Sequence, residues 1–140
     1  MSSPDQRPGV LFLCVHNAGR SQMALGWFRQ LAGDRARAWS AGSEPAASVN
    51  PSAIAVMAEV GIDIAGQQPQ RWTDDLLHQT DVVVTMGCGD ACPVVPGVRY
   101  EDWPLDDPAG RSVDAVRPIR DEIERRVHAL LDQLGVPAGH

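Results

Sequence analysis

The sequence predicts a three-layer α/β domain in which helices flank a four-stranded parallel sheet. The first observation behind this prediction is that short, continuous apolar runs alternate along the chain with segments of helical periodicity. The second is that the clearest β-branched run, 81–86, shows no polar alternation, which is typical of a parallel strand buried on both faces. Because 140 residues is the length of one compact domain, we expect a single domain over residues 1–140, with residues 1–8 as a loosely ordered lead-in.

The first strand, the following loop and the first helix are predicted from residues 10–31. The apolar run 10–13 has the length of a buried strand. The next apolar residues fall on one helical face: Met23, Ala24, Trp27, Phe28 and Leu31. Residues 14–21 therefore form a loop between the end of a strand and the start of a helix.

The remaining elements continue this alternation. We expect strands over 36–42, 81–86 and 98–103, and a short helix that begins at Asn50-Pro51-Ser52. Residues 87–96 and 104–110 have the composition of loops. A last helix, ended by Gly135 and Pro137, follows from apolar residues at three- and four-residue spacing: Val116, Ile119, Ile123, Val127, Leu130, Leu131 and Leu134. Ligands of parallel sheets bind beyond the carboxyl ends of the strands, so we expect the loops that carry Cys14, Cys88 and Asp107 to meet there.

The loop from Cys14 to Ser21 has the composition of a site for a tetrahedral oxyanion. Unpaired main-chain amides at the start of a helix favour an anion, and the forked guanidinium of Arg20 adds further N–H donors. The same positive surroundings favour the thiolate of Cys14, which is the nucleophilic form. The candidate anion-binding residues are Val15, His16, Asn17, Ala18, Gly19, Arg20 and Ser21.

The side chains of this loop also have structural interpretations. Cys14 alone is more often a small buried apolar residue than a catalyst. Asn17 and Gly19 tolerate a left-handed backbone, so that Gly19 turns the amides inward and Asn17 braces the loop. The hydroxyl of Ser21 is placed to donate to the Cys14 thiolate or to cap the helix, and the two roles are compatible. His16 lines the mouth of the loop or acts on a proton, although an exposed loop histidine usually does neither.

Two aspartates, Asp106 and Asp107, precede Pro108 in the loop 104–110. Turn chemistry accounts for them, since aspartate side chains accept hydrogen bonds from nearby main chain and proline fixes a turn. A thiolate that attacks an oxyanion also needs a proton for the leaving oxygen, and a partly desolvated carboxyl is a suitable general acid. The residues alone leave both aspartates as candidates for this role.

Cys88 and Cys92 form a C-x3-C pair, for which we consider half of a zinc site, a redox pair and two inert buried thiols. Zinc is disfavoured because no histidine stands at ligand spacing from another, and we expect no metal and no cofactor. A disulfide requires the two Cα atoms to come within about 7 Å, which a loop containing glycine permits.

Composition and charge exclude several classes of protein. A formal net charge of −6 argues against a nucleic-acid partner, and it means that local donors must supply any affinity for an anion. No apolar run is long enough to span a membrane, and the N-terminus lacks the pattern of a signal peptide. Three cysteines are an odd number in a chain that needs no disulfide framework. We therefore expect a cytoplasmic protein that does not associate with membranes.

The loop Cys14–Ser21 with the following Gln22-Met23-Ala24 resembles the phosphate loop of the low-molecular-weight tyrosine phosphatases. Asp107-Pro108 is similar to the general-acid loop of that fold, whose acid directly precedes proline; this resemblance favours Asp107 over Asp106. Three further segments, 40–42, 85–93 and 103–109, are similar to the thioredoxin-coupled arsenate reductases of this superfamily. The resemblance spans most of the chain.

This resemblance implies a reaction in which Cys14 attacks arsenate held by the loop amides and Arg20, while Asp107 protonates the departing oxygen. Cys88 then attacks the Cys14 sulfur and expels arsenite, and Cys92 attacks Cys88. Thioredoxin reduces the resulting disulfide, so we expect residues 87–96 to move. Leu25 stands where some relatives have a glutamate associated with a potassium site, which again predicts no metal. We expect a monomer.

Three alternatives stay open from the sequence. The first is a phosphotyrosine or phosphomonoester phosphatase that uses Cys14, Arg20 and Asp107; it leaves Cys88 and Cys92 without a role, and it lacks the aromatic residues that usually follow the Asp-Pro pair. The second is an arsenate reductase that draws electrons from a low-molecular-weight thiol such as mycothiol. The third is a non-catalytic phosphate or redox sensor.

Overall fold

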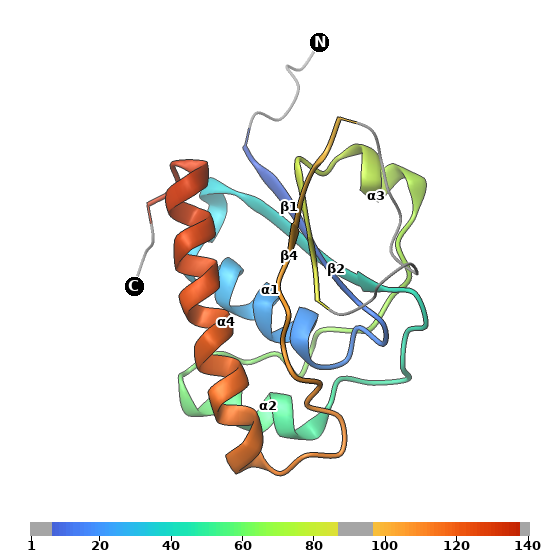
Figure 1. The fold of residues 1–140 in the computed structure, drawn as a ribbon, viewed down its shortest axis with the longest axis vertical. Coiled ribbons are helices and arrows are strands. Elements are labelled where there is room, and N and C mark those ends of the chain that lie inside the picture. Colours follow the sequence, from blue (N-terminus) through green and yellow to red (C-terminus); the bar gives the residue numbers. More distant parts are fainter. Residues whose placement is uncertain (1–6, 87–96, 138–140) are drawn as a thin grey trace.

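The predicted parallel α/β fold is confirmed by the computed structural model, which describes residues 7–86 and 97–137 (Figure 1). Four parallel strands form one sheet in the order β2-β1-β3-β4: β1 Gly9–Cys14, β2 Arg37–Gly42, β3 Val82–Thr85 and β4 Arg99–Asp102. The helices are α1 Arg20–Ala32, η1 Gly33–Arg35, α2 Pro51–Glu59, α3 Asp74–His78 and α4 Val113–Leu134. Every predicted strand is present within two residues of its expected bounds.

Strand β1 lies in the middle of the sheet and divides the apolar side chains between two cores. Phe12 and Cys14 face the larger core with α1 and α4, while Leu11 and Leu13 face the smaller one. This follows from the alternation of side chains along a strand. Phe12 packs edge-on against Phe28 of α1, with ring centroids 5.7 Å apart. Both faces of β1 are therefore buried, as its continuous apolar sequence predicts.

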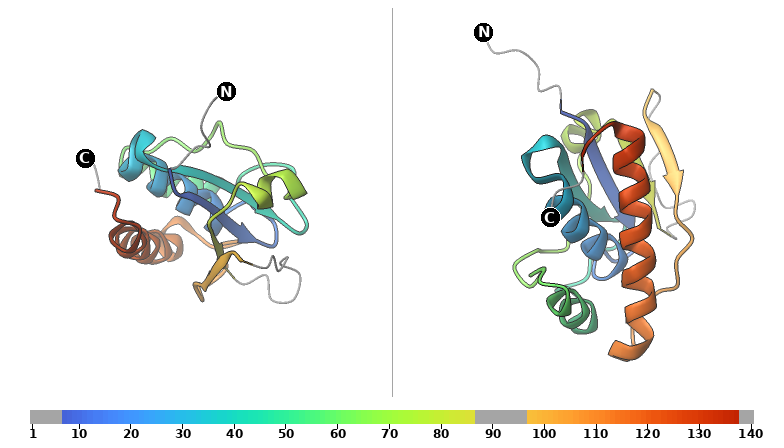
Figure 2. Two further views of the ribbon diagram at one scale, coloured as in Figure 1. Left: turned by 90° about the horizontal axis from the view of Figure 1, so that it is seen from above. Right: turned by 90° about the vertical axis from the view of Figure 1, so that its left-hand side faces the viewer.

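Helix α1 is more deeply buried than an amphipathic helix. The predicted apolar face is inside, but residues 20–28 are all buried, polar ones included. The sheet, α4 and α2 all contact this helix, and α1 and α4 run side by side (Figures 1 and 2). At Gly26, an added Cβ would come within 2.8 Å of Ile64, so the segment after α2 closes the remaining side.

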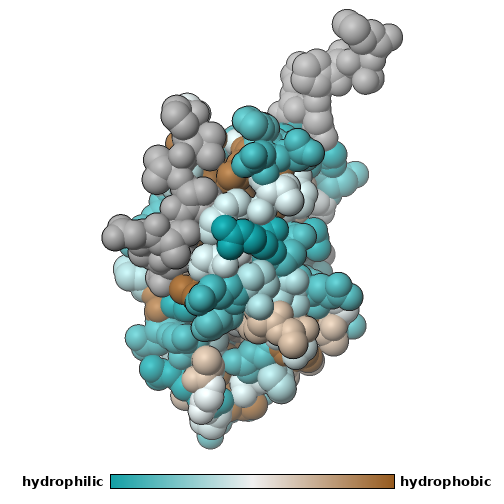
Figure 3. Space-filling model, turned by 90° about the vertical axis from the view of Figure 1, so that its right-hand side faces the viewer, coloured by the Kyte–Doolittle hydropathy of each residue, from teal (hydrophilic) through white to brown (hydrophobic). Residues whose placement is uncertain are grey.

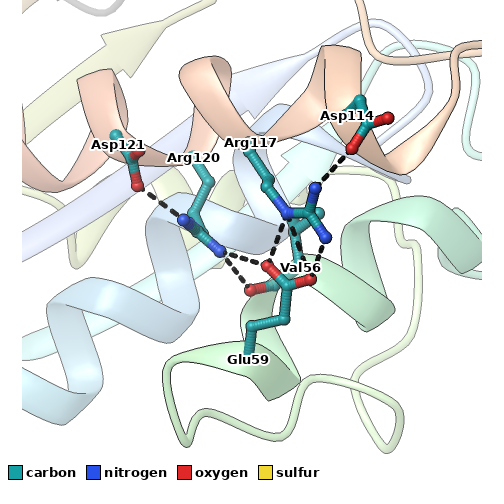
Figure 4. Close-up of polar contacts among 6 residues, drawn as sticks. All are labelled: Val56, Glu59, Asp114, Arg117, Arg120 and Asp121. Atoms are coloured by element: carbon teal, nitrogen blue, oxygen red, sulfur yellow. Dashed lines mark hydrogen bonds and ion pairs between the residues drawn. The ribbon is translucent and has the colours of Figure 1, made fainter.

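Ion pairs join helices α2 and α4 (Figure 4), and apolar residues of both helices belong to the same core cluster. Glu59, the last residue of α2, accepts from Arg117 Nη2 at 2.6 Å and from Arg120 Nη1 at 2.8 Å. Arg120 also donates to the main-chain oxygen of Val56 at 2.9 Å. The guanidinium groups of Arg117 and Arg120 therefore converge on the C-terminal end of α2.

The opposite face of the sheet is covered in part by α3, which the sequence analysis missed. Leu76 and Leu77 of this five-residue helix pack with Leu11, Leu13 and Val83. Thr73 caps the helix by accepting from the amide of Leu76 at 3.1 Å. A helix of this length has too few turns to show a periodic pattern in the sequence.

The face seen in Figure 3 is mostly hydrophilic, with small and separate hydrophobic spots. Across residues 7–86 and 97–137, none of the helices combines the length and the apolar character needed to cross a bilayer.

Candidate active site

The candidate site lies at the carboxyl end of the sheet, where β1 ends at Cys14 and the loop to α1 begins. A pocket of about 160 Å³ opens there. The loop contributes Cys14, His16, Ala18, Gly19 and Arg20 to its lining, and three other segments contribute Ala46, Asn50, Asp107, Pro108 and Ala109. The structure therefore brings Cys14, Arg20 and Asp107 to one cavity, as expected for loops at this edge of a parallel sheet.

The loop turns its carbonyl groups away from the pocket. Five consecutive carbonyl oxygens accept hydrogen bonds from surrounding donors: Val15 from Glu44 N, His16 from Ala46 N, Asn17 from Gln22 Nε2, Ala18 from Asn50 N and Gly19 from Met23 N. Within the described parts of the chain, the amides of residues 15–19 donate to no protein group. Amides left free at the start of a helix are the donors that an anion uses.

The thiol of Cys14 lies on a short chain of polar side chains. Cys14 Sγ is 2.9 Å from Ser21 Oγ, and Ser21 Oγ accepts from Asn17 Nδ2 at 2.7 Å. Asn17 Oδ1 in turn accepts from the amide of Gln70 at 2.9 Å, which fixes the orientation of the Asn17 amide. Either atom of the Cys14–Ser21 contact can donate; when Cys14 is a thiolate, only the Ser21 hydroxyl can, and its proton is then directed to the sulfur. The Ser21 hydroxyl is therefore placed to donate to a thiolate at Cys14.

The interpretation of Ser21 as a helix cap is wrong. Helix α1 begins at Arg20, so the capping position belongs to Gly19, and Ser21 lies inside the first turn. The sequence analysis named Asn17 and Gly19 as residues that tolerate a left-handed backbone, and one of these two adopts it. Asn17 has a φ of 50°, in the left-handed region, whereas Gly19 has a φ of −129°.

Two glycines permit close approach around the loop. At Gly19, an added Cβ would lie 2.5 Å from Cγ of Pro108, so the glycine lets the loop 104–110 rest on the anion loop. At Gly42, the end of β2, an added Cβ would lie 2.5 Å from the carbonyl oxygen of Val15. Both contacts depend on the missing side chain and not on an unusual backbone conformation.

Arg20 and Asp107 face each other across the pocket. Arg20 is buried; it donates from Nη1 to the main-chain oxygen of Leu105 at 3.3 Å, and its Nη2 lies 3.8 Å from Asp107 Oδ2. Asp107 is half exposed, with 53% of its side chain accessible, and its Oδ1 accepts from the amide of Ala109 at 2.9 Å. This turn, of the kind expected before Pro108, leaves Oδ2 directed toward the guanidinium. Asp106 is absent from the pocket lining.

His16 lines the pocket, and its Nδ1 lies 3.1 Å from the main-chain oxygen of Glu44. Asn50 was predicted only as a helix start, and it does cap α2 by accepting from the amide of Ser52 at 2.8 Å. It also lines the pocket, a position that follows from contacts remote in sequence and gives no local signal. The contact of Gln70 with Asn17 likewise gives no local signal, because it joins segments far apart in the chain.

Cys88 and Cys92 lie outside the described residues, so the predicted redox pair remains a prediction. Among the residues that the structure does describe, no three histidine, cysteine, aspartate or glutamate side chains gather as a metal site would require.

Comparison with known proteins assigns the family. Residues 9–137 match the model of the low molecular weight phosphotyrosine protein phosphatases. The chain belongs to this family. Among sequence relatives, arsenate reductase 2 of Staphylococcus epidermidis is 43% identical over 124 residues, which cover 86% of this chain and 93% of that protein. The resemblance to the arsenate reductases of the family is thereby confirmed.

Solved structures give the same result. A thioredoxin-dependent arsenate reductase of Corynebacterium glutamicum matches with a TM-score of 0.82 and 39% identity over 96% of this chain; the match spans 64% of that longer chain. An arsenate reductase in a phosphate-binding state matches with a TM-score of 0.78 and 36% identity, covering 91% of this chain and 98% of the other.

Proposed function

We propose that this protein reduces arsenate to arsenite, with Cys14 as nucleophile and a Cys14, Cys88 and Cys92 disulfide cascade that thioredoxin regenerates. The observation that carries the proposal is the pocket lined by Cys14, Arg20, Asp107 and the loop residues His16, Ala18 and Gly19. Relatives with 43% identity are named arsenate reductases, and a solved neighbour is named a thioredoxin-dependent one.

The first step is attack on bound arsenate. Amide groups of the loop and the Arg20 guanidinium hold three equatorial oxygens, and the Ser21 hydroxyl, whose Oγ lies 2.9 Å from the Cys14 sulfur, is placed to donate to the attacking thiolate. The sulfur forms a bond to arsenic, and the opposite oxygen leaves as water after taking protons, one of which comes from Asp107. Asp107 Oδ2 lies on the pocket side of its loop, near Arg20, where a leaving oxygen is within reach.

The second step transfers two electrons. Cys88 thiolate attacks the Cys14 sulfur, the S–As bond breaks, and its electron pair stays on arsenic, which leaves as arsenite. Cys92 then attacks Cys88, releases the Cys14 thiolate and closes a disulfide between Cys88 and Cys92. Thioredoxin supplies the two electrons that reopen this disulfide. A donor of this class belongs to a reducing compartment, which fits a cytoplasmic monomer that binds neither nucleic acid nor membranes.

Phosphate has the same shape and a similar charge as arsenate, so the pocket alone discriminates poorly between them. Phosphate cannot accept the electron pair under these conditions, and the redox step therefore provides the selectivity. A second candidate function, hydrolysis of phosphomonoesters, uses Cys14, Arg20 and Asp107 without the other cysteines. The family match favours it, whereas the small residue Ala109 at the pocket wall gives an aromatic ring no stacking partner.

The test compares two activities in a Cys88→Ser variant. We expect arsenate turnover with thioredoxin to fall to background while any hydrolysis of an aryl phosphate is retained, because hydrolysis needs no second thiol. Cys14→Ser is the control that abolishes both. Arsenate turnover that survives Cys88→Ser would rule out the cascade, and turnover that requires mycothiol in place of thioredoxin would identify the other electron donor.

A further inference from the structure

One peptide of the anion loop is held differently from its neighbours. The carbonyl oxygens of Val15, His16, Ala18 and Gly19 accept from main-chain amides, which any residue supplies. The carbonyl oxygen of Asn17 instead accepts from a side chain, Nε2 of Gln22, at 2.8 Å. Among the five loop carbonyls, this is the one whose restraint depends on the identity of a side chain.

The restrained carbonyl determines where the next amide points. In a trans peptide the C=O and N–H groups point in opposite directions. Gln22 holds the Asn17 oxygen away from the pocket, so the N–H of Ala18, in the same peptide, is aimed into it, and Ala18 lines the pocket. Asn17 has a φ of 50°, a conformation that non-glycine residues adopt at a cost, and this peptide therefore needs an external restraint.

The orientation of the Gln22 amide is itself fixed by a second glutamine. A carbonyl oxygen can only accept, so the Gln22 atom that faces Asn17 must be nitrogen, and its Oε1 faces the other way. That oxygen accepts from Nε2 of Gln67 at 2.7 Å, and the same nitrogen lies 3.1 Å from the main-chain oxygen of Gln22. Gln22 is completely buried, which leaves water no part in setting its orientation.

We propose that Gln22 and Gln67 are positioning residues that aim the Ala18 N–H at the bound oxyanion. These hydrogen bonds form a relay of side chains. The half-buried Gln67, in the segment between α2 and α3, donates to the buried Gln22 of α1, and Gln22 donates to the Asn17 carbonyl oxygen of the loop. It deepens the proposed function, on which it rests for the assumption that this loop binds a tetrahedral anion. Neither glutamine lines the anion pocket, so their effect is on binding geometry and not on the chemistry of the sulfur.

The first experiment replaces Gln22 by the similarly shaped methionine and measures binding of inorganic phosphate by titration calorimetry. The loss of one aimed donor to an anion should raise the phosphate Kd about tenfold. Gln30→Met, at an exposed position on the same helix, is the matched control and should bind as the unchanged protein does.

The chemical shifts of the loop amide protons distinguish a misdirected Ala18 N–H from a disordered loop. In the unchanged protein, saturation with phosphate should shift the Ala18 amide proton downfield, as a hydrogen bond to an anion does. In Gln22→Met this shift should shrink while the shifts of the other loop amides persist. A uniform loss of all the loop shifts would indicate a disordered loop and would overturn the specific role in aiming Ala18.

Variants of Gln67 test the second link and cover the case in which the buried Gln22→Met fails to fold. Gln67→Met should raise the phosphate Kd about threefold, because the Gln22 amide loses the donor that orients it. Gln67→Glu should raise it further, since a carboxylate attracts Nε2 of Gln22 away from Asn17. Gln68→Met is the control at the adjacent exposed position. Equal effects of methionine and glutamate at position 67 would contradict the relay.

The relay and the proposed function fail in different ways. If the protein binds phosphate and the Gln22 and Gln67 variants bind it equally well, the relay is excluded whatever the result with arsenate. If these variants bind phosphate more weakly but the protein does not reduce arsenate, the relay stands and the proposed function falls.

Discussion

Gly19 contacts the loop that carries Asp107, and this contact gives the first prediction at the scale of single residues. A Cβ at position 19 would lie 2.5 Å from Cγ of Pro108 and would push that ring, with the adjacent Asp107, away from the pocket. We expect Gly19→Ala to lower kcat for arsenate about tenfold, which is less than the complete loss of a general acid would cause. The inhibition constant for phosphate should stay the same. Steady-state kinetics measures both.

Gly66→Ala is the control for this substitution, because an added Cβ at that position meets nothing within 4 Å. An unchanged kcat in Gly19→Ala would mean that Asp107 keeps its position or does not supply the proton.

Ser21 gives a second prediction at this scale. Its Oγ lies 2.9 Å from Cys14 Sγ, where the hydroxyl is placed to donate to a thiolate. We expect Ser21→Ala to slow alkylation of Cys14 by iodoacetamide at neutral pH about fivefold, since a lost hydrogen bond to the thiolate lowers its population. Mass spectrometry of the modified protein follows the rate. Ser48→Ala, at an exposed position, should react as the unchanged protein does; equal rates for all three proteins would exclude the donor role of Ser21.

The sequence indicated local contacts between residues better than remote ones. The proximity of Ser21 to Cys14 and the left-handed Asn17 follow from a loop between a strand and a helix. The contact of Gln70 with Asn17 joins residues that are 53 positions apart, and no local pattern encodes it. Gly19 was correctly singled out for the wrong reason, because a close approach by Pro108 is visible only once the chain is folded.

At the scale of elements, the junction between α2 and α4 makes stability depend on pH. Hydrogen bonds from Arg117, followed by those from Arg120, lower the pKa of Glu59 from 4.5 to about 2. The unfolded chain therefore binds a proton at Glu59 at a higher pH than the folded protein does. The free energy of unfolding contributed by this group is fully present above pH 4.5 and is lost as the pH falls from 4.5 toward 2.

The corresponding prediction concerns Glu59→Gln. This variant should be less stable than the unchanged protein at pH 7, and the difference should shrink as the pH falls below 4.5. Urea unfolding across this pH range measures it. Glu124→Gln is the control, since Glu124 is a half-exposed residue that pairs with His128 inside α4. A stability difference that stays constant down to pH 3 would contradict the assigned role of Glu59.

The elements that the sequence predicted are those with a strong periodic signal. The apolar runs 10–13 and 81–86 correspond to β1 and β3, and the long amphipathic pattern corresponds to α4. Helix α3 was missed because its five residues are too few for a period, and its stability depends on Leu76 and Leu77 packing against the sheet. Tertiary contacts, and not local propensity, decide such short elements.

At the scale of the whole molecule, the net charge of the protein is negative, whereas the candidate site is suited to bind an anion. The chain carries a formal net charge of −6, so its overall field does not attract arsenate, and the anion loop must supply the affinity by direct contacts. We expect kcat/KM for arsenate to change by less than about twofold between roughly 20 and 200 mM potassium chloride. Initial rates at low arsenate concentration measure kcat/KM. A steep fall of kcat/KM with salt would indicate long-range attraction of arsenate and would contradict this view.

The fold itself does not separate a reductase from a phosphatase. Sheet, anion loop and Asp107 loop suit both reactions. The proposed reduction of arsenate requires two electrons, for which the three cysteines in the sequence offer a source. The sequence could indicate this chemistry because the number and spacing of cysteines are local features. The approach of Cys88 to Cys14 is a tertiary contact, and it remains a prediction.

The most direct test of the central claim is a map of the disulfide bonds after a single turnover. Reduced protein is mixed with one equivalent of arsenate in the absence of thioredoxin, alkylated, digested and analysed by mass spectrometry, with phosphate in place of arsenate as the control. We predict a disulfide between Cys88 and Cys92, an alkylated Cys14 and one equivalent of arsenite. Recovery of all three cysteines as alkylated thiols after arsenate treatment would contradict the account.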